Sequence, residues 1–225
     1  MARWHSERQT LWEVTGEMVK QGLVAGSSGN ASLRLPGDGD GGYVLITPSG
    51  RPYRYLAPED MVVIDMDGGP VEGDLLPSSE TAMHLELYKA RQDVEAIIHT
   101  HSLYASVAAV SGLEIPPIVV EMVIRVGGSV RVAEYAFPST EELAQNAGHA
   151  LGDRNAVLLR NHGMVGVGRT SWEALDLCQM VERVAQIFVY SSLLGRALTL
   201  PSEIIEMEQE LYRMQGLRSG TPRET

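Results

Sequence analysis

Two histidines separated by a single residue follow a short apolar run. His99 and His101 come directly after residues 94–98, whose composition indicates a strand that runs into a polar end. Because successive side chains of a strand point to opposite faces, the two imidazoles lie on one face and Thr100 lies on the other. Neutral imidazole is the commonest protein ligand for zinc-like metals. The pair therefore predicts half of a tetrahedral metal site, or else two strand-end histidines that face water.

A third histidine lies in a turn between two further apolar runs. His162 is the middle residue of Asn161–Gly163, and we expect strands over residues 156–160 and 164–167 on either side of it. Asn and Gly tolerate the unusual backbone dihedrals of a tight turn. A single histidine in such a turn would usually only decorate the surface. Together with two other histidines at a strand end, it gives three ligands and an open fourth position, which is the pattern of a catalytic zinc site.

Glu80 is the candidate acid/base. It follows Pro77-Ser78-Ser79, which we expect to open a helix that reaches about Arg91, with the serines as N-caps and Glu80 in the first turn. A carboxylate at that place often does no more than compensate the helix dipole. The serine hydroxyls and the backbone N–H groups of the same helix start form a natural phosphate site, however, and this would place Glu80 beside a substrate. His84, one turn further on, is expected behind the site or in the core.

Composition restricts the classes of function. The chain has 225 residues, of which 44% are hydrophobic and 21% charged, as in an ordinary globular protein. Its formal net charge of −11 disfavours nucleic acid or an anionic membrane as a partner, although a metal and backbone N–H groups can hold a small phosphorylated substrate. We expect neither a signal peptide nor a membrane anchor. The single cysteine, Cys178, forbids an intramolecular disulfide, so we expect a cytoplasmic location.

The basic residues argue against one further kind of chemistry. Among 18 Lys and Arg residues, only Lys20 and Lys89 are lysines. Both lie in amphipathic helical patterns with charged neighbours, so both are expected to face solvent. A Schiff-base mechanism, which needs a reactive lysine, is therefore not expected.

Turn signals divide the chain into short elements. Helices are expected over residues 6–22, 77–91, 102–110, 140–151, 171–194 and 202–214, and strands over residues 31–35, 43–47, 61–66, 94–101, 129–133, 156–160 and 164–167. Because most neighbouring strands are joined by short turns, we expect a largely antiparallel sheet with helices packed on it. We expect one domain over residues 1–217 and a flexible tail over residues 218–225.

Five short motifs, taken in order, resemble those of the class II aldolase/adducin superfamily. They are Ser28-Gly29-Asn30, Thr47-Pro48-Ser49-Gly50, Pro77-Ser78-Ser79-Glu80, His99-Thr100-His101 and Asn161-His162-Gly163. Each motif alone is weak, but the five together follow the order of the family and cover nearly the whole chain. The resemblance implies an α/β fold, namely an αβα three-layer sandwich with a largely antiparallel central sheet. It also implies a homotetramer with active sites at the subunit interfaces.

The resemblance also implies a site and a reaction. It implies Zn²⁺ on His99, His101 and His162, with other divalent metals such as cobalt and manganese left open. Glu80 would be the catalytic acid/base and a candidate fourth ligand. Substrate phosphate would be held by Ser28, Gly29, Asn30, Ser49, Gly50, Ser78 and Ser79. The implied reaction is reversible cleavage of a ketose 1-phosphate, such as L-fuculose 1-phosphate, to dihydroxyacetone phosphate and an aldehyde, in which the metal stabilises the enediolate and Glu80 moves the proton.

Two positions depart from the aldolase branch of this superfamily. That branch has a tyrosine, contributed to a neighbour's active site, where this chain has Glu121. A second family tyrosine corresponds to Gln215, with Tyr212 nearby but out of register. These departures leave the second proton donor open and make Glu121 a second catalytic candidate.

Three alternatives follow from the resemblance. A Glu-Met pair at Glu121 resembles the methylthioribulose-1-phosphate dehydratase branch, in which that glutamate is the acid/base, but that branch lacks the glutamate retained at Glu80. The ribulose-phosphate 4-epimerase branch typically has aspartate at the position of Glu80, which disfavours epimerisation. An adducin-like structural module is disfavoured as well, because such domains have lost the metal histidines and this chain retains all three.

Overall fold

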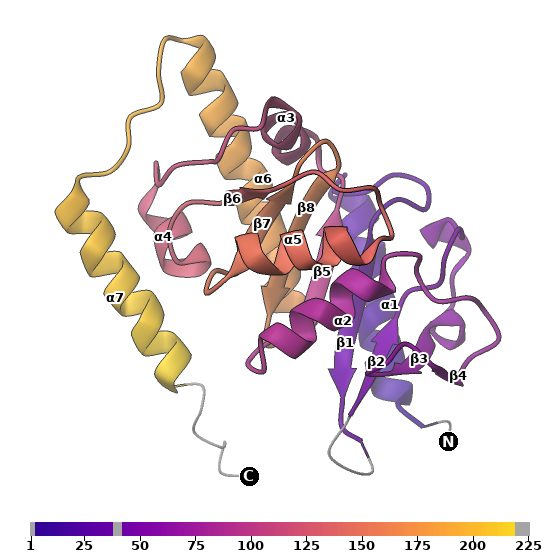
Figure 1. The fold of residues 1–225 in the computed structure, drawn as a ribbon. Coiled ribbons are helices and arrows are strands. Elements are labelled where there is room, and N and C mark those ends of the chain that lie inside the picture. Colours follow the sequence, from indigo (N-terminus) through magenta and orange to yellow (C-terminus); the bar gives the residue numbers. More distant parts are fainter. Residues whose placement is uncertain (1–2, 38–41, 219–225) are drawn as a thin grey trace.

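The computed structural model describes residues 3–37 and 42–218, and these are built around one mixed sheet (Figure 1). Its strands are β1 (Asn30–Leu35), β2 (Tyr43–Ile46), β3 (Val62–Asp65), β4 (Pro70–Glu72), β5 (Ala96–Thr100), β6 (Arg131–Ala133), β7 (Ala156–Leu159) and β8 (Gly163–Gly168). Their order in the sheet is β4-β3-β2-β1-β5-β8-β7-β6. All neighbouring pairs are antiparallel except β6 and β7, which are parallel. The predicted largely antiparallel sheet is confirmed.

Helices cover both faces of this sheet (Figure 1). They are α1 (His5–Lys20), α2 (Thr81–Ala90), α3 (Leu103–Ser111), α4 (Val120–Val126), α5 (Glu141–Leu151), α6 (Ser171–Leu193) and α7 (Ser202–Arg218). Helices α2 and α5 pack on one face, whereas α1, α3 and α6 pack on the other. The αβα three-layer sandwich that the motifs implied is therefore confirmed.

The alternation of side chains along β5 explains why the core has two parts. Ile97 belongs to the apolar cluster beneath α2 and α5, and Ile98 belongs to the cluster beneath α1, α3 and α6. Neighbouring strand residues point to opposite faces, and all five residues of β5 are buried because both faces are covered. The first three residues of the strand are therefore all apolar, and its polar end, His99 and Thr100, is buried as well.

The C-terminal part of the chain departs from the expected elements. Helix α4 was not predicted, and α7 continues to Arg218 and not only to Met214. The two helices pack against each other at the side of the molecule (Figure 1). The predicted tail over 218–225 lies, except for its first residue, outside the described residues. Among the helices of the described ranges, none is both long and apolar enough to cross a bilayer.

Candidate functional site

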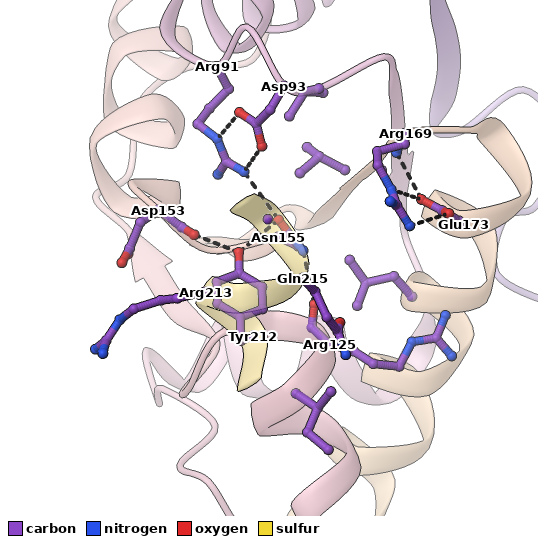
Figure 2. A pocket seen from close by; sticks show the side chains of 16 residues that line it. Arg91, Asp93, Arg125, Asp153, Asn155, Arg169, Glu173, Tyr212, Arg213 and Gln215 are labelled. Atoms are coloured by element: carbon purple, nitrogen blue, oxygen red, sulfur yellow. Dashed lines mark hydrogen bonds and ion pairs between the residues drawn. The ribbon is translucent and has the colours of Figure 1, made fainter. Parts of the chain in front are cut away.

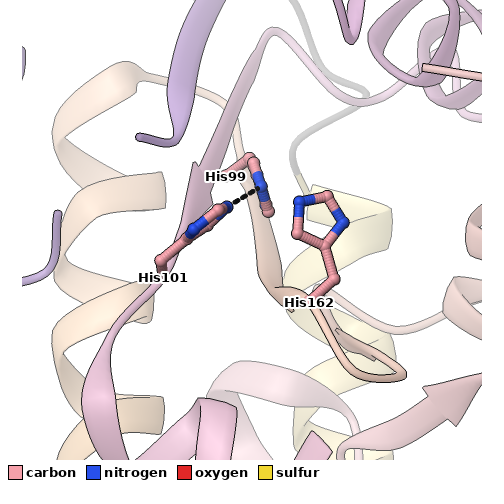
Figure 3. Close-up of side chains that lie close together, drawn as sticks. All are labelled: His99, His101 and His162. Carbon is pink, nitrogen blue, oxygen red and sulfur yellow. Dashed lines mark hydrogen bonds between the residues drawn. The ribbon is translucent and has the colours of Figure 1, made fainter. Parts of the chain in front are cut away.

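The three histidines meet at one end of the central strands. His99 lies on β5, His101 follows that strand directly, and His162 lies in the turn between β7 and β8 (Figure 3). One ring nitrogen from each residue lies within 4.8 Å of the other two. The Nε2 atoms of His99 and His101 are 2.9 Å apart. Residues separated by more than sixty positions thus form a cluster of three imidazole nitrogens, as a tetrahedral metal site requires.

The backbone around His162 explains how the third ring reaches the other two. Asn161 adopts a left-handed φ of 57°, so the chain reverses tightly between β7 and β8. Thr100 then pairs with Met164 in the β5–β8 ladder. A Cβ atom at Gly163 would collide with the backbone oxygen of Thr100 and would lie 3.1 Å from Cδ2 of His101. The absence of a side chain at Gly163 therefore permits the close approach of the turn to β5.

The environment of His99 prepares its Nε2 atom to act as a ligand. Its Nδ1 atom lies 2.9 Å from the backbone oxygen of Met164. A carbonyl oxygen only accepts hydrogen bonds, so Nδ1 carries the proton and Nε2 keeps its lone pair. Burial lowers the pKa of His99 to about 3, even though the carboxylate of Glu80 opposes this shift. Burial also lowers the pKa of His101. Both rings are thus neutral at physiological pH, the state that binds a metal.

Glu80 lies directly against the histidines. Its Oε2 atom is 3.2 Å from Nε2 of His99 and accepts a 2.8 Å hydrogen bond from Nδ2 of Asn30. Its Oε1 atom is 3.4 Å from Nε2 of His162, is buried, and has no hydrogen-bond partner. Burial acts to raise the pKa of Glu80, but the two histidines and the Asn30 amide outweigh it and hold the pKa below its usual value. The carboxylate is therefore ionised, with one oxygen directed at the histidine cluster.

The start of helix α2 corrects one expectation. The helix begins at Thr81 with Glu80 as its N-cap residue, and the Glu80 side chain makes no capping hydrogen bond. Glu80 is thus not in the first turn, and neither serine is the N-cap. The backbone N–H of Ser78 donates to the oxygen of Thr47, which holds this segment against the neighbouring loop and outside the helix. The Glu80 side chain is consequently turned toward the histidines and not toward the N–H groups of the first helical turn.

A cleft of about 200 Å³ opens beside Glu80. It is lined by Ser27, Ser28, Gly29, Asn30, Pro48, Ser49, Gly50, Ser78, Ser79, Glu80, His101, Pro138, Ser139 and His162. Every residue predicted to hold phosphate lies in this set. The three segments that carry these residues, 28–30, 49–50 and 78–79, therefore meet at one cleft. Ser27, Pro138 and Ser139 were not predicted. Ser139 has a left-handed φ of 69°, and the Pro-Ser-Thr turn signal before α5 is the only local hint of its position.

The contacts of the loops refine the expected phosphate site. The N–H of Ser49 donates to the oxygen of Leu76, and the N–H of Ser78 is likewise used by a carbonyl, so neither is available to a ligand. Asn30 uses one amide hydrogen to hold Glu80. The hydroxyl of Ser28 is also used, because it donates to the oxygen of Ala25 at 2.7 Å, whereas the hydroxyls of Ser49, Ser78 and Ser79 remain as donors. Among the described lining residues there is no lysine or arginine, so an anion bound there would be held by neutral donors.

Two buried residues support this site although the sequence analysis gave them no specific role. Tyr53 donates a 2.9 Å hydrogen bond from its hydroxyl to the backbone oxygen of Gly29. His84 is completely buried, as expected for a residue behind the site, and its Nε2 lies 2.5 Å from Oδ1 of Asn30. Burial lowers the pKa of His84 to about 4, so this ring is neutral. No local sequence signal distinguishes either residue from ordinary core.

Glu121 does not join the cleft within one chain. It is exposed in the first turn of α4 and does not line the cleft beside Glu80. Gln215 and Tyr212 lie elsewhere, in a second pocket of about 460 Å³ (Figure 2). That pocket also contains residues that precede β5 and end β8, so it lies at the opposite end of these strands from the histidines.

The second pocket is lined by charged groups that largely neutralise one another. Arg91 pairs with Asp93 at 2.6 Å and Arg169 pairs with Glu173 at 2.9 Å (Figure 2). The hydroxyl of Tyr212 lies 2.6 Å from the backbone oxygen of Asp153, so this tyrosine is already engaged. Among the described residues the one cluster of candidate metal ligands is the histidine triad and not a group in this pocket, so the histidine cleft is the candidate active site.

Comparison with known proteins shows the family of the chain. The model of the Class II Aldolase and Adducin N-terminal domain matches residues 9–189. The chain is 36% identical to 5-deoxy-D-ribulose 1-phosphate aldolase of Bacillus thuringiensis serovar kurstaki over 210 residues, covering 93% of this chain and 96% of that protein. It is 34% identical to 5-methylthioribulose-1-phosphate/5-deoxyribulose-1-phosphate aldolase of Rhodospirillum rubrum over 215 residues, covering 96% and 95% of the two chains.

The solved structure of an L-fuculose 1-phosphate aldolase superposes with a TM-score of 0.86 at 37% identity, covering 92% of this chain and 95% of that one. The family resemblance that the five motifs indicated is confirmed by these matches, which extend over nearly the whole chain. The chain therefore belongs to the class II aldolase and adducin family, and it is an enzyme of the aldolase type.

Proposed function

We propose that this protein is a zinc-dependent aldolase that reversibly cleaves a ketose 1-phosphate to dihydroxyacetone phosphate and an aldehyde. One observation carries the proposal. The ionised carboxylate of Glu80 lies against His99 and His162 with its Oε1 atom unpartnered, and Glu80 lines the cleft formed by the serine-rich loops. A metal-ligand set, an acid/base and a phosphate-type site thus share one cleft, which is the combination that cleavage of a phosphorylated ketose requires.

The donor set fits a divalent cation. Three imidazole nitrogens converge, two of the rings are held neutral by burial, and Oε1 of Glu80 is a buried acceptor without a partner. We assign the cation to His99, His101 and His162, with Glu80 as the candidate fourth ligand, and zinc is favoured because it prefers nitrogen donors in a tetrahedral arrangement. When bound, such a cation supplies Lewis-acid stabilisation of the negative charge that develops on the ketose oxygens.

Substrate phosphate is assigned to the loops opposite the histidines. Ser28, Gly29, Ser49, Gly50, Ser78 and Ser79 line that wall of the cleft. The hydroxyls of Ser49, Ser78 and Ser79 can donate hydrogen bonds without adding charge, and a neutral set of this kind suits a phosphate that the enzyme must later release. Asn30 takes a different part, because its amide holds Glu80.

Glu80 is assigned the proton transfer. Cleavage breaks the C3–C4 bond, releases the C4 hydroxyl proton with the aldehyde carbonyl, and leaves electron density at C3 of the three-carbon fragment. That carbon must gain a proton to become dihydroxyacetone phosphate. An ionised carboxylate is the proper starting state for a group that accepts a proton in one half of the reaction and returns it in the other.

Glu121 and a neighbouring subunit supply the second part of the proposal. Leu103, Val107 and Val110 recur at helical spacing on α3 and are 65%, 40% and 59% exposed, which leaves an apolar stripe on the surface of one chain. We assign this surface to contacts within a homotetramer whose active sites lie at subunit interfaces. Glu121, exposed on α4, would then act in the cleft of a neighbour.

We place this enzyme in the cytoplasm, in keeping with its single buried cysteine.

The relatives' names favour a specific second candidate for the substrate. L-fuculose 1-phosphate is one candidate, from the name of the structural neighbour. The relatives at 36% and 34% identity are named for 5-deoxyribulose 1-phosphate, and the second also for 5-methylthioribulose 1-phosphate. These ketose 1-phosphates differ in the aldehyde that cleavage would release, so one assay on a panel of substrates separates them.

A coupled assay for dihydroxyacetone phosphate tests the proposal. Zinc-loaded protein and EDTA-treated protein are given the three ketose 1-phosphates in parallel. We expect metal-dependent release from at least one of them, and the best substrate names the aldehyde. Failure of every substrate to release dihydroxyacetone phosphate, with zinc fully bound, would refute the aldolase proposal and favour dehydration through Glu121. Glu80→Gln should abolish cleavage with zinc retained, whereas Glu121→Gln should leave part of the activity.

A further inference from the structure

A line of buried polar side chains runs from the core to Glu80. The hydroxyls of Tyr88 and Ser32 are 2.9 Å apart, and Oγ of Ser32 is 2.6 Å from Nδ1 of His84. On its other side, Nε2 of His84 is 2.5 Å from Oδ1 of Asn30, whose Nδ2 donates to Glu80 at 2.8 Å. Ser32, His84 and Tyr88 are completely buried, and Asn30 is 4% exposed. Five polar residues thus form one continuous hydrogen-bonded chain.

The direction of every hydrogen bond in this chain is determined by its last member. An ionised carboxylate only accepts, so Asn30 must present its NH₂ group to Glu80 and its carbonyl oxygen to His84. A carbonyl oxygen also only accepts, so Nε2 of His84 must carry the proton. In a neutral ring the other nitrogen is then an acceptor, and it is the nitrogen that faces the hydroxyl of Ser32. The hydroxyl of Tyr88 completes the sequence by donating to Ser32.

We propose that His84 is a positioning residue for Glu80. Its Nε2–H tautomer, held by Ser32 and Tyr88, prevents the Asn30 amide from turning over. The amide in turn fixes Oε2 of Glu80 and leaves Oε1 as the oxygen that faces His162. This inference rests on the acid/base role proposed for Glu80, and it assigns to His84 a task in the same reaction without contact to substrate.

Loss of the His84 donor has a definite consequence for the site. Without Nε2–H, nothing holds the Asn30 carbonyl oxygen, and the amide keeps only its bond to Glu80. With one of its two hydrogen bonds gone, the amide can tilt and shift, and the Glu80 carboxylate that it holds beside His99 loses its fixed position. The orientation of the proton-transferring oxygen is therefore set by a residue one helical turn away from Glu80.

The apolar surroundings of these hydrogen-bonded side chains argue against a role for His84 in packing alone. On α2, His84 lies between Met83 and Leu85, both in the apolar core beneath the sheet. Burying hydroxyl, imidazole and amide groups in such a core is costly unless every group is paired, and an apolar side chain would avoid the cost altogether. Here every member of the hydrogen-bonded chain has a partner in it, and only its last two members, Asn30 and Glu80, line the cleft.

Two substitutions at His84 separate positioning from packing. His84→Leu removes the donor and keeps the site apolar and filled, whereas His84→Gln places an amide N–H near the original Nε2 position. We expect His84→Leu to lower kcat about 10- to 100-fold, as is usual for residues that orient a ligating or catalytic group, with a smaller change in KM and full zinc content. His84→Gln should recover much of the lost kcat. Leu87→Val, a core change on the same helix, should lower Tm and leave kcat unchanged.

A double-mutant comparison tests whether His84 acts through Asn30. Asn30→Ala should lower kcat on its own, and adding His84→Leu to it should then have little further effect, because the path to Glu80 is already broken. The inference would be overturned if the fold-decreases in kcat of the two single variants multiplied in the double variant. It would also be overturned if His84→Leu had the kcat of the wild-type protein. The result with Glu80→Gln keeps the two proposals distinct, since full activity there refutes the acid/base role itself.

The tautomer offers a readout that does not depend on activity. Long-range ¹H–¹⁵N NMR spectra of the zinc-loaded, histidine-labelled protein distinguish a protonated Nε2 from a protonated Nδ1. We expect His84, assigned by its loss in His84→Gln, to carry its proton on Nε2. In Ser32→Ala the preference should weaken because Nδ1 loses its donor. A proton on Nδ1 of His84 in the wild-type protein would contradict the hydrogen-bond directions assigned between Tyr88 and Glu80.

Discussion

The hydroxyl of Tyr53 donates a 2.9 Å hydrogen bond to the backbone oxygen of Gly29. This bond ties the 3₁₀ helix Tyr53–Tyr55 to the loop over residues 26–30, which lines the cleft. The backbone N–H of Tyr53 also bonds to the oxygen of Gly26 at the other end of that loop. Burial raises the pKa of Tyr53, so its hydroxyl is protonated and acts as a donor at neutral pH. One residue thus holds both ends of a loop that we assign to phosphate binding.

Tyr53→Phe should weaken substrate binding more than catalysis. The change removes one hydrogen bond to a partly buried carbonyl, which costs about 1 to 3 kcal/mol. We expect KM for the ketose 1-phosphate to rise severalfold and kcat to change little, together with a lower Tm. Steady-state kinetics and thermal unfolding measure both. Tyr55→Phe is the matched control, because Tyr55 lies in the same 3₁₀ helix but is 66% exposed, and equal effects of the two changes would contradict the role of Tyr53.

Gly163→Ala should disturb the metal site directly. The new methyl group would collide with the backbone oxygen of Thr100 and would lie 3.2 Å from Cε1 of His99. Relief of this contact must move the turn that carries His162, at a cost of about 1 to 3 kcal/mol in unfolding free energy. We expect a lower Tm and weaker zinc binding, measured by differential scanning calorimetry and by competition with a chelating dye.

Gly16→Ala is the control for Gly163→Ala in both measurements. A methyl group at Gly16, in α1, would meet no heavy atom within 4 Å. Alanine has the higher helix propensity by about 1 kcal/mol, so this variant should be slightly more stable and bind zinc normally. If Gly163→Ala resembled Gly16→Ala in both measurements, the tight approach of the turn to β5 would be disproved.

The parts of the molecule that were predictable from sequence are those set by local pattern. The run ahead of His99 is apolar and rich in isoleucine, so both the strand and the emergence of its polar end could be inferred. The same holds for His162, because Asn161 and Gly163 signal a turn between two apolar runs. Residues that follow strand ends collect at one edge of a sheet, which is why three separate histidines could be expected to meet.

The parts that were not predictable depend on contacts between distant segments. The serines at 78 and 79 carry a strong local signal for a helix start, yet the pairing of Pro77 with Pro48 holds this segment extended and delays α2 until Thr81. Helix α4 has the sequence VEMVIRV, whose β-branched residues favour a strand, and its contact with α7 overrides that preference. The bond from His84 to Asn30 joins residues 54 positions apart, and no spacing rule reveals it.

Cys178 should be inert in the folded enzyme. Its side chain is completely buried between α6 and the sheet, and burial raises the pKa of its thiol to about 12. Only the thiolate is nucleophilic, so we expect no reaction with Ellman's reagent at pH 8 in the native state and one thiol per chain in guanidinium chloride. Modification with iodoacetamide of the native protein should leave activity unchanged. Rapid reaction without denaturant would mean that α6 separates readily from the sheet.

Zinc should stabilise the folded protein through His162 in particular. A ligand that binds only the native state adds about 2.7 kcal/mol of stability at a free concentration 100 times its dissociation constant, so Tm should rise with zinc concentration in the wild-type protein. His162 lies in the turn between β7 and β8, so His162→Ala removes a ligand without changing a strand, and the zinc-dependent rise in Tm should nearly vanish. His149→Ala, an exposed position on α5, should retain the full rise. An undiminished rise in His162→Ala would place the cation elsewhere in the protein.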